Sequence, residues 1–178
     1  MACLVINKSD EGCAGRVGTL LKEGKAGIIP CDTIYGLSAI AVPECGERLY
    51  EIKRRPQSKS FITLMSKEDA TSSSLDIPSD IMDRWPAPLT AIVRDRESGL
   101  THAVRVPSDS FIQEVLRISG PIYSTSVNFS GEKSLLTFSE IYPVFSSLVD
   151  FAVDDPSVAG GIASTLIDAT VKPYRVIR

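Results

Sequence analysis

The chain has 178 residues, 43% of them hydrophobic and 23% charged, and a formal net charge of −3. This composition is ordinary for a globular protein, and no apolar stretch approaches the roughly 20 residues that a membrane-spanning helix needs. The acidic balance argues against broad electrostatic adhesion to nucleic acid, although it is compatible with a local basic pocket. We expect one domain over residues 1–178, located in the cytoplasm and without a membrane segment.

The first half of the chain predicts helices that alternate with strands. Residues 10–23 place Val17, Leu20 and Leu21 on one helical face, and Gly24 is placed to end that helix. The other elements expected in this half are a strand at 26–30, a loop and strand at 31–38, a helix at 43–54, a strand at 60–65, a short helix with a loop at 66–77 and a helix at 78–85.

The alternation continues in the second half. Residues 110–119 predict a helix that buries Ile112, Val115 and Leu116. Because helices and strands alternate without repeats, the sequence predicts an α/β fold, α+β by some schemes, with a mixed and largely open sheet flanked by helices. The other elements expected here are strands at 89–94 and 103–106, a turn and short apolar strand at 120–123, a helix at 139–145, and strands at 151–153, 164–168 and 174–178.

A polar run at residues 124–131 holds five hydroxyl or amide side chains and no carboxylate or base. We expect it to begin where the preceding strand ends, a common place for ligand contacts in layered α/β domains. Its side chains suit an anionic or sugar-bearing ligand. The alternative is a turn followed by a helix cap, in which the same side chains satisfy local backbone groups.

A basic cluster spans Lys53 to Lys59, with four cations in seven residues and Pro56 to stop the preceding helix. Arginine offers a planar fork of donors and lysine a mobile point charge, so the two together suit adjacent phosphates. The alternative is a solvated basic helix end, which the helix dipole favours.

One predicted strand places Thr101, Ala103 and Arg105 on a shared face. An arginine on that face needs an anion. The candidates are an internal carboxylate, Asp32 or Asp109, and the carboxylate of a small substrate.

Metal-binding residues are sparse. The four cysteines all lie in the first quarter of the chain without a close C-x-x-C pair, and His102 is the single histidine. Neither a zinc site nor a disulfide framework is suggested, so we expect no protein-bound metal.

In this order, the segments resemble the YrdC family, the threonylcarbamoyl-AMP synthases also called TsaC, from about Gly15 to Arg178. The resemblance implies a YrdC-like twisted sheet with a concave ligand pocket, in the short form that lacks a separate C-terminal domain. The segments that carry it are P-C-D-T-I-Y-G-L at 30–37, K-R-R at 53–55, W-P-A-P-L-T at 85–90, R-V-P at 105–107, S-T-S-V-N-F-S-G at 124–131 and the glycine-led S-T-L-I-D at 160–168.

The resemblance implies that L-threonine, bicarbonate or CO2, and ATP give threonylcarbamoyl-AMP and pyrophosphate, for the N6-threonylcarbamoyl modification of adenosine 37 in tRNA. Lys53 and Arg55 would act catalytically on the phosphates, with Mg²⁺ carried by ATP. It also implies downstream tRNA threonylcarbamoyl-transfer proteins as partners and leaves direct tRNA binding open. The implied threonine contacts are Cys31, Arg105 and Ser124, and the implied ATP contacts are Lys59, Thr101, Ser126, Asn128, Ser134, Ser164 and Arg178.

Two positions depart from the family pattern. Cys31 stands where the family usually has threonine, and Leu64 stands where some members have histidine. Two alternative functions follow: a carbamoyl-adenylate enzyme that uses a different amine, and an RNA-binding or accessory protein that grips tRNA with the basic cluster. The second would call for several basic stripes interleaved with aromatic residues, whereas the sequence has one basic cluster.

Overall fold

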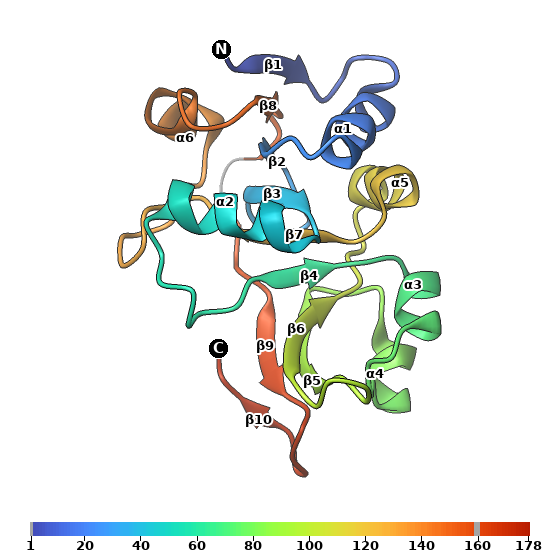
Figure 1. The fold of residues 1–178 in the computed structure, drawn as a ribbon. Helices are drawn as coiled ribbons and strands as arrows, with labels where there is room; N and C mark the ends of the chain where they lie inside the picture. The colour runs from blue at the N-terminus through green and yellow to red at the C-terminus, as the bar shows by residue number, and fades with distance from the viewer. Residues whose placement is uncertain (1, 159–160) are drawn as a thin grey trace.

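A computed structural model describes residues 2–158 and 161–178, which form a mixed sheet of ten strands with helices on its faces (Figure 1). The strand order is β1-β8-β2-β3-β7-β4-β6-β5-β9-β10. The strands are β1 (Leu4–Asn7), β2 (Gly27–Ile29), β3 (Gly36–Ile40), β4 (Ile62–Leu64), β5 (Leu89–Arg94), β6 (Thr101–Arg105), β7 (Ile122–Ser126), β8 (Phe151–Asp154), β9 (Thr165–Asp168) and β10 (Arg175–Val176).

Parallel and antiparallel pairs both occur. β1 and β2 run parallel to β8, β4 parallel to β6, and β5 parallel to β9, whereas β7 is antiparallel to both β3 and β4. The predicted mixed sheet flanked by helices is therefore confirmed. The helices are α1 (Cys13–Lys22), α2 (Pro43–Lys53), α3 (Lys67–Ser72), α4 (Ser79–Arg84), α5 (Ser110–Ser119) and α6 (Phe138–Phe145).

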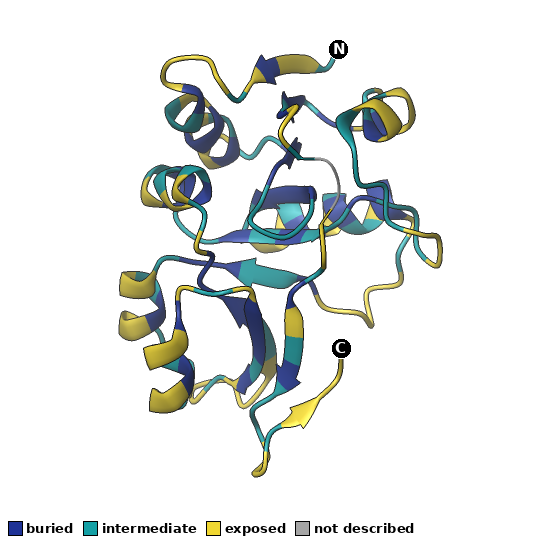
Figure 2. Cartoon of the chain, turned by 180° about the vertical axis from the view of Figure 1, so that it is seen from behind, coloured by how far each residue is buried: buried dark blue, intermediate teal, exposed yellow. Residues whose placement is uncertain are grey.

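The helices divide the apolar core into three clusters. α1 and α5 lie side by side in Figure 1 and share a core with Ile29, Leu64 and Phe151. α2 and α6 pack on a second cluster that includes Leu37, and α3 and α4 on a third around Trp85. Figure 2 shows the buried sides of the helices turned toward the sheet and their exposed sides turned to solvent. Among the described residues, no helix is long and apolar enough to cross a membrane.

Two strands differ from the sequence-based prediction. β1 was not predicted, because its register is set by β8, whose residues lie 147 positions further along the chain, and its own four residues show no clear alternation. β7 runs on to Ser126, so the first three residues of the polar run, at 124–126, lie inside the strand and not after it. The reason is that β7 is a central strand, and its antiparallel pairing with β3 extends to the Gly36–Ser126 pair.

The remaining elements are confirmed with shifted ends. The helix expected at 10–23 begins at Cys13, and the strand expected in 31–38 begins only at Gly36, after a loop. β6 covers 101–105 instead of 103–106. Strand ends depend on which neighbouring strand supplies hydrogen bonds, and helix ends vary by one or two residues with the capping geometry, so a local pattern fixes neither.

Close packing at Gly27 gives a stability prediction. A Cβ added there would overlap the ring of Phe151, the register partner of Gly27 on β8. Gly27→Ala should therefore lower the free energy of unfolding by about 1–3 kcal/mol, because overpacking forces neighbours aside. Gly15→Ala is the matched control: its Cβ would lie 3.9 Å from Ile118 Cδ1 in an ordinary contact. Urea unfolding of both variants tests this, and equal midpoints would contradict it.

Candidate active site

A cavity of about 390 Å³ opens over the middle of the sheet. Six adjacent strands, β3, β7, β4, β6, β5 and β9, each contribute at least one residue to its lining. The loop before β3, the segment before β4, the segment before β9 and Arg178 form its rim. Antiparallel pairing brings the end of β7 beside the start of β3, and the parallel β4–β6 pair brings Leu64 beside Arg105. The site thus collects segments that are far apart in sequence.

A buried arginine marks one end of the cavity. The side chain of Arg105 is 5% exposed, and its Nη2 lies 3.2 Å from Asp32 Oδ1. Nη1 donates to Thr33 Oγ1 at 3.1 Å, and Nη2 also donates to Cys31 Sγ at 3.0 Å. The Nε–H has no acceptor among the described residues. Of the anions proposed from the sequence, Asp32 is the internal partner of Arg105.

Asp32 connects this loop to the start of α5. Its Oδ2 accepts from the backbone N–H and the hydroxyl of Ser108, each at 3.1 Å. Burial alone would raise the pKa of Asp32, but Arg105, Cys31 and Ser108 together lower it below its usual value. The carboxylate therefore stays ionised and holds Arg105 in place.

The thiol of Cys31 is a neutral group. It donates to Asp32 Oδ1 at 3.0 Å. Burial raises its pKa to about 12 despite the nearby Arg105. A thiol in this state is a poor nucleophile, since the thiolate is the reactive form. Cys31 therefore acts here as wall and hydrogen-bond partner.

The second half of β7 supplies hydroxyl groups to the cavity floor. Ser38 donates to Ser124 Oγ at 3.1 Å, and Ser126 Oγ donates to Asn128 Oδ1 at 2.8 Å. Arg55 reaches the same floor from the loop after α2, with Nη1 3.4 Å from Thr125 Oγ1. The guanidinium group of Arg55 and the hydroxyl groups of β7 therefore line the same cavity. A site for a polyphosphate requires such a combination of a cation and hydrogen-bond donors.

Lys53 has a different environment from the one expected. Its side chain is 1% exposed, and Nζ donates to the backbone oxygens of Ser126 and Asn128 and to Asn128 Oδ1. Burial and the neighbouring Arg55 lower its pKa to about 8. Lys53 was expected to act on the phosphates of ATP, whereas here it is buried and all three of its N–H donors hold the 126–128 segment.

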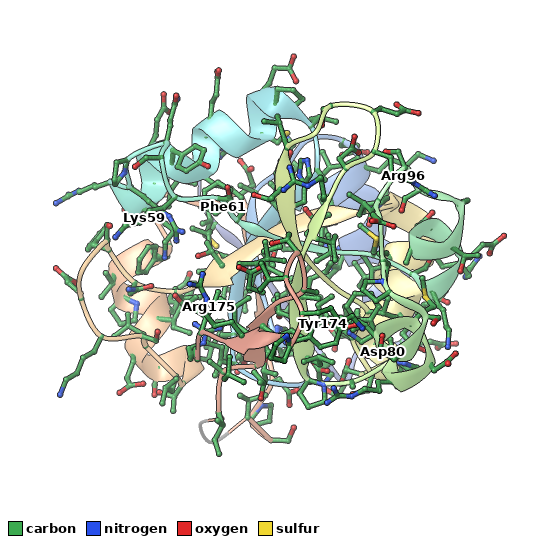
Figure 3. The ribbon with its side chains drawn as sticks, turned by 90° about the horizontal axis from the view of Figure 1, so that it is seen from below. Lys59, Phe61, Asp80, Arg96, Tyr174 and Arg175 are labelled. Atoms are coloured by element: carbon green, nitrogen blue, oxygen red, sulfur yellow. The ribbon has the colours of Figure 1, made fainter. Side chains whose placement is uncertain are left out.

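The sequence-predicted site residues divide into two groups. Those that line the cavity are Cys31, Arg55, Arg105, Ser124, Ser126, Ser164 and Arg178. Those outside its lining are Lys53, Lys59, Thr101, Asn128 and Ser134. Lys59 is exposed and lies toward the outside of the molecule in Figure 3, whereas the nearby Phe61 is buried and lies closer to the middle. Thr101 shares the face of Arg105, as predicted, but sits at the exposed start of β6.

Sequence reasoning missed the apolar part of the lining. These residues carry no reactive group, and the signal that could have found them is alternation along strands that were themselves predicted. They include Ile34, Phe61, Ile62, Ile92 and Leu166.

The rim segment before β9 is fixed at two points. A Cβ added to Gly161 would overlap the carbonyl oxygen of Thr33, so only glycine allows this approach. Further along, Ser164 and Thr90 share a hydrogen bond at 2.8 Å, and the guanidinium of Arg178 donates to the carbonyl oxygen of Ser164 at 3.4 Å. The segment thereby closes one side of the cavity.

Comparison with known proteins identifies similar chains. The model of the Sua5, YciO and YrdC family, described as "Telomere recombination", matches residues 19–178. A threonylcarbamoyl-AMP synthase of Pyrococcus abyssi is 31% identical over 89% of this chain and 51% of its own length, so the chain spans about half of that relative. A threonylcarbamoyl-AMP synthase of Pseudoalteromonas translucida is 28% identical over 90% of this chain and 95% of its own length. The structure of P. abyssi Sua5 complexed with L-threonine matches with a TM-score of 0.84 and 26% identity, over 100% of this chain and 57% of that one.

Proposed function

The chain belongs to the Sua5, YciO and YrdC family, and we propose that it is an L-threonylcarbamoyladenylate synthase, an ATP-dependent nucleotidyltransferase. Its substrates would be L-threonine, bicarbonate or CO2, and ATP, and its products threonylcarbamoyl-AMP and pyrophosphate. The observation that carries the proposal is the cavity itself, which is lined by Arg105, by Arg55 and by the hydroxyl-bearing end of β7. One end of the cavity suits a carboxylate and the other a polyphosphate.

The chemistry needs positioning and charge neutralisation. The threonine carboxylate binds Arg105, and the neutral amine attacks CO2 and loses one N–H proton to solvent, which gives a carbamate. A carbamate oxygen then attacks the α-phosphorus of ATP, and pyrophosphate leaves. Arg55 and Arg178, both on the lining, neutralise the charge that develops on the phosphates. No protein nucleophile takes part, in keeping with the protonated thiol of Cys31.

Mg²⁺ would arrive on the ATP phosphates. Within the described residues, no three His, Cys, Asp or Glu side chains gather where they could hold a metal ion. Mg²⁺ usually keeps several water ligands and binds through substrate phosphates, so this lining fits an ion carried by the nucleotide. Bound in that way, it would supply positive charge at the leaving pyrophosphate.

The adenylate would serve the N6-threonylcarbamoyl modification of adenosine 37 in tRNA. Its acyl-phosphate linkage is reactive toward amines, so a downstream tRNA threonylcarbamoyl-transfer protein would consume it. The cavity described here accounts for nucleotide and amino acid, and tRNA would meet the product on that later protein.

Pyrophosphate release tests the proposal. The purified chain is incubated with ATP, Mg²⁺, bicarbonate and each of several amino acids, and pyrophosphate and the adenylate are followed by a coupled assay and mass spectrometry. We expect release that depends on both bicarbonate and an amino acid. The absence of any L-threonine-dependent release would sink the proposal, and tight tRNA binding without nucleotide binding would favour the accessory function instead.

A further inference from the structure

Arg54 has a backbone conformation that arginine rarely adopts. It ends α2 with φ 50° and ψ 44°, in the left-handed region, and it is the one non-glycine residue with a positive φ among residues 2–158 and 161–178. Glycine is the usual residue at such a helix end, because a Cβ is unfavourable in this conformation. The side chain of Arg54 is exposed and does not line the cavity. An outlier of this kind points to a role for the side chain.

The guanidinium group of Arg54 lies over the ring of Phe129, with its Cζ 4.5 Å from the ring centroid. The Phe129 ring also contacts Phe145 of α6, at a centroid distance of 5.0 Å. The loop after β7, which carries Phe129, lies beside the C-terminal end of α2 (Figure 1), and the backbone N–H of Ser130 donates to the carbonyl oxygen of Lys53 at 2.9 Å. The stacked pair and this hydrogen bond together join the end of α2 to the loop after β7.

This joint lies between two groups that are proposed for the nucleotide. Arg55, directly after Arg54, lines the cavity, and so does Ser126 at the end of β7. The left-handed residue between Lys53 and Arg55 turns the chain, so that the ammonium group of Lys53 binds the backbone after β7 while the guanidinium group of Arg55 lies in the cavity. A shift of the loop after β7 relative to α2 would therefore change the spacing between Arg55 and the Ser126 hydroxyl.

We propose that Arg54 is a positioning residue for the nucleotide phosphates. Its stacking on Phe129 holds the loop after β7 against α2 and thereby keeps Arg55 and the Ser126 hydroxyl at a fixed spacing. Arg54 itself touches no phosphate. This role rests on the proposed function and adds to it a residue outside the cavity. An exposed cation–π contact is worth a factor of about two to five in an equilibrium constant, so loss of the contact should weaken ATP binding by about that factor.

A glycine at position 54 separates positioning from stability. Arg54→Gly removes the stacked cation but also relieves the left-handed conformation, so its two effects on stability oppose each other and Tm should stay close to that of the wild type. Calorimetric titration should show a Kd for ATP raised about two- to fivefold. Amide hydrogen exchange of Ser130 should be faster, while exchange in β5 and β6 should not change. Arg54→Lys keeps a cation near the ring and should restore most of the affinity.

Phe129→Leu distinguishes stacking from charge, because it removes the aromatic ring and keeps every charged group. It should raise the Kd for ATP as much as Arg54→Gly does, and the double variant should raise it no further, since both changes remove the same contact. Wild-type ATP affinity in Phe129→Leu, with a loss in Arg54→Gly, would assign the effect to the charge of Arg54 and overturn the proposal.

The Arg54→Gly variant can overturn the proposal in two further ways. Its affinity for ATP could equal that of the wild type, which would show that the stacking does not position the phosphate groups. Its Tm could fall, with faster exchange throughout the sheet, which would show that Arg54 only stabilises the fold. If the wild-type protein bound no ATP, the proposed function would fail, and the exchange rate of Ser130 would still decide whether Arg54 holds the loop.

Discussion

Replacing Arg105 with glutamine is expected to lower kcat/KM for the amino acid by about 10²–10³-fold and to leave the KM for ATP nearly unchanged. Removing one partner of a buried, hydrogen-bonded charge pair costs about 2–5 kcal/mol, and each 1.4 kcal/mol is a factor of ten. The side chains of Arg105 and Asp32 are 5% and 9% exposed, so water screens neither charge well. The loss should fall on the amino acid because Arg105 lies at the carboxylate end of the cavity.

Two further variants show whether that loss reflects binding or misfolding. Arg105→Lys keeps a positive charge near Asp32 but lacks the planar fork, so it should preserve thermal stability better than glutamine while still weakening amino-acid binding. Arg117→Gln is the matched control, because its pair with Glu114 is on the surface and Arg117 is 69% exposed. The test measures initial rates while the concentrations of ATP and of the amino acid are varied in turn, which gives a KM for each. If Arg105→Gln raised the KM for ATP and not that for the amino acid, the two ends of the cavity would have been assigned the wrong way round.

The fold was largely predictable because most elements carry their own periodic signal. The helix at 110–119 places Ile112, Val115 and Leu116 on one face, and all three are buried. β1 and the second half of β7 were not predictable in the same way. β1 exists because β8 pairs with it, and the hydroxyl-rich end of β7 is strand because β3 extends alongside. Pairing between distant segments decides both cases, and hydrophobic alternation does not encode it.

The sequence motifs pointed to several residues that line the cavity. Cys31, Arg105 and Ser124 come from three separate segments, and the sheet brings all three to one cavity. The sequence could not show burial, so it treated every cation of the basic cluster as a surface group. Of these, Arg55 lines the cavity, Lys59 is exposed outside it, and Lys53 lies beneath it. The sequence of a basic cluster does not show which of its cations will be buried, which will line a cavity and which will be exposed.

Lys53→Met is therefore expected to destabilise the protein as well as to reduce turnover. Each buried acceptor left without a donor costs about 1–3 kcal/mol, and Lys53 serves three of them. Part of that cost is recovered because a buried cation is also removed, so we expect a loss of about 3 kcal/mol, or a Tm lower by about 6–12 °C. Release of the 126–128 segment should also lower kcat/KM for ATP by about 10²-fold, since small misplacements of positioning groups have effects of that size.

The pH dependence of the wild-type protein gives an independent measure of the same role. Burial and the neighbouring Arg55 lower the pKa of Lys53 in the folded protein to about 8, from the usual 10.5 of a lysine side chain. Between these values the unfolded chain binds more protons than the folded one, so the contribution of this group makes the folded state more stable as pH rises from 8 to 10.5. Turnover should nevertheless fall above pH 8, because a neutral amine donates to only two of its three acceptors. A fall in rate without a fall in Tm identifies a local change at Lys53 and excludes unfolding.

The decisive comparison is between stability and nucleotide affinity across matched variants. Lys22→Met removes an exposed lysine at the end of α1 and should match the wild type in both, with a free energy of unfolding within about 0.5 kcal/mol. Thermal unfolding and ATP titration of the two methionine variants provide the data. If Lys53→Met kept the wild-type Tm and lost only ATP affinity, its ammonium group would contact the phosphates directly, as the basic cluster first suggested. If it lost both, the hydrogen bonds to Ser126 and Asn128 account for its role, and the polar end of β7 depends on a cation buried beneath it.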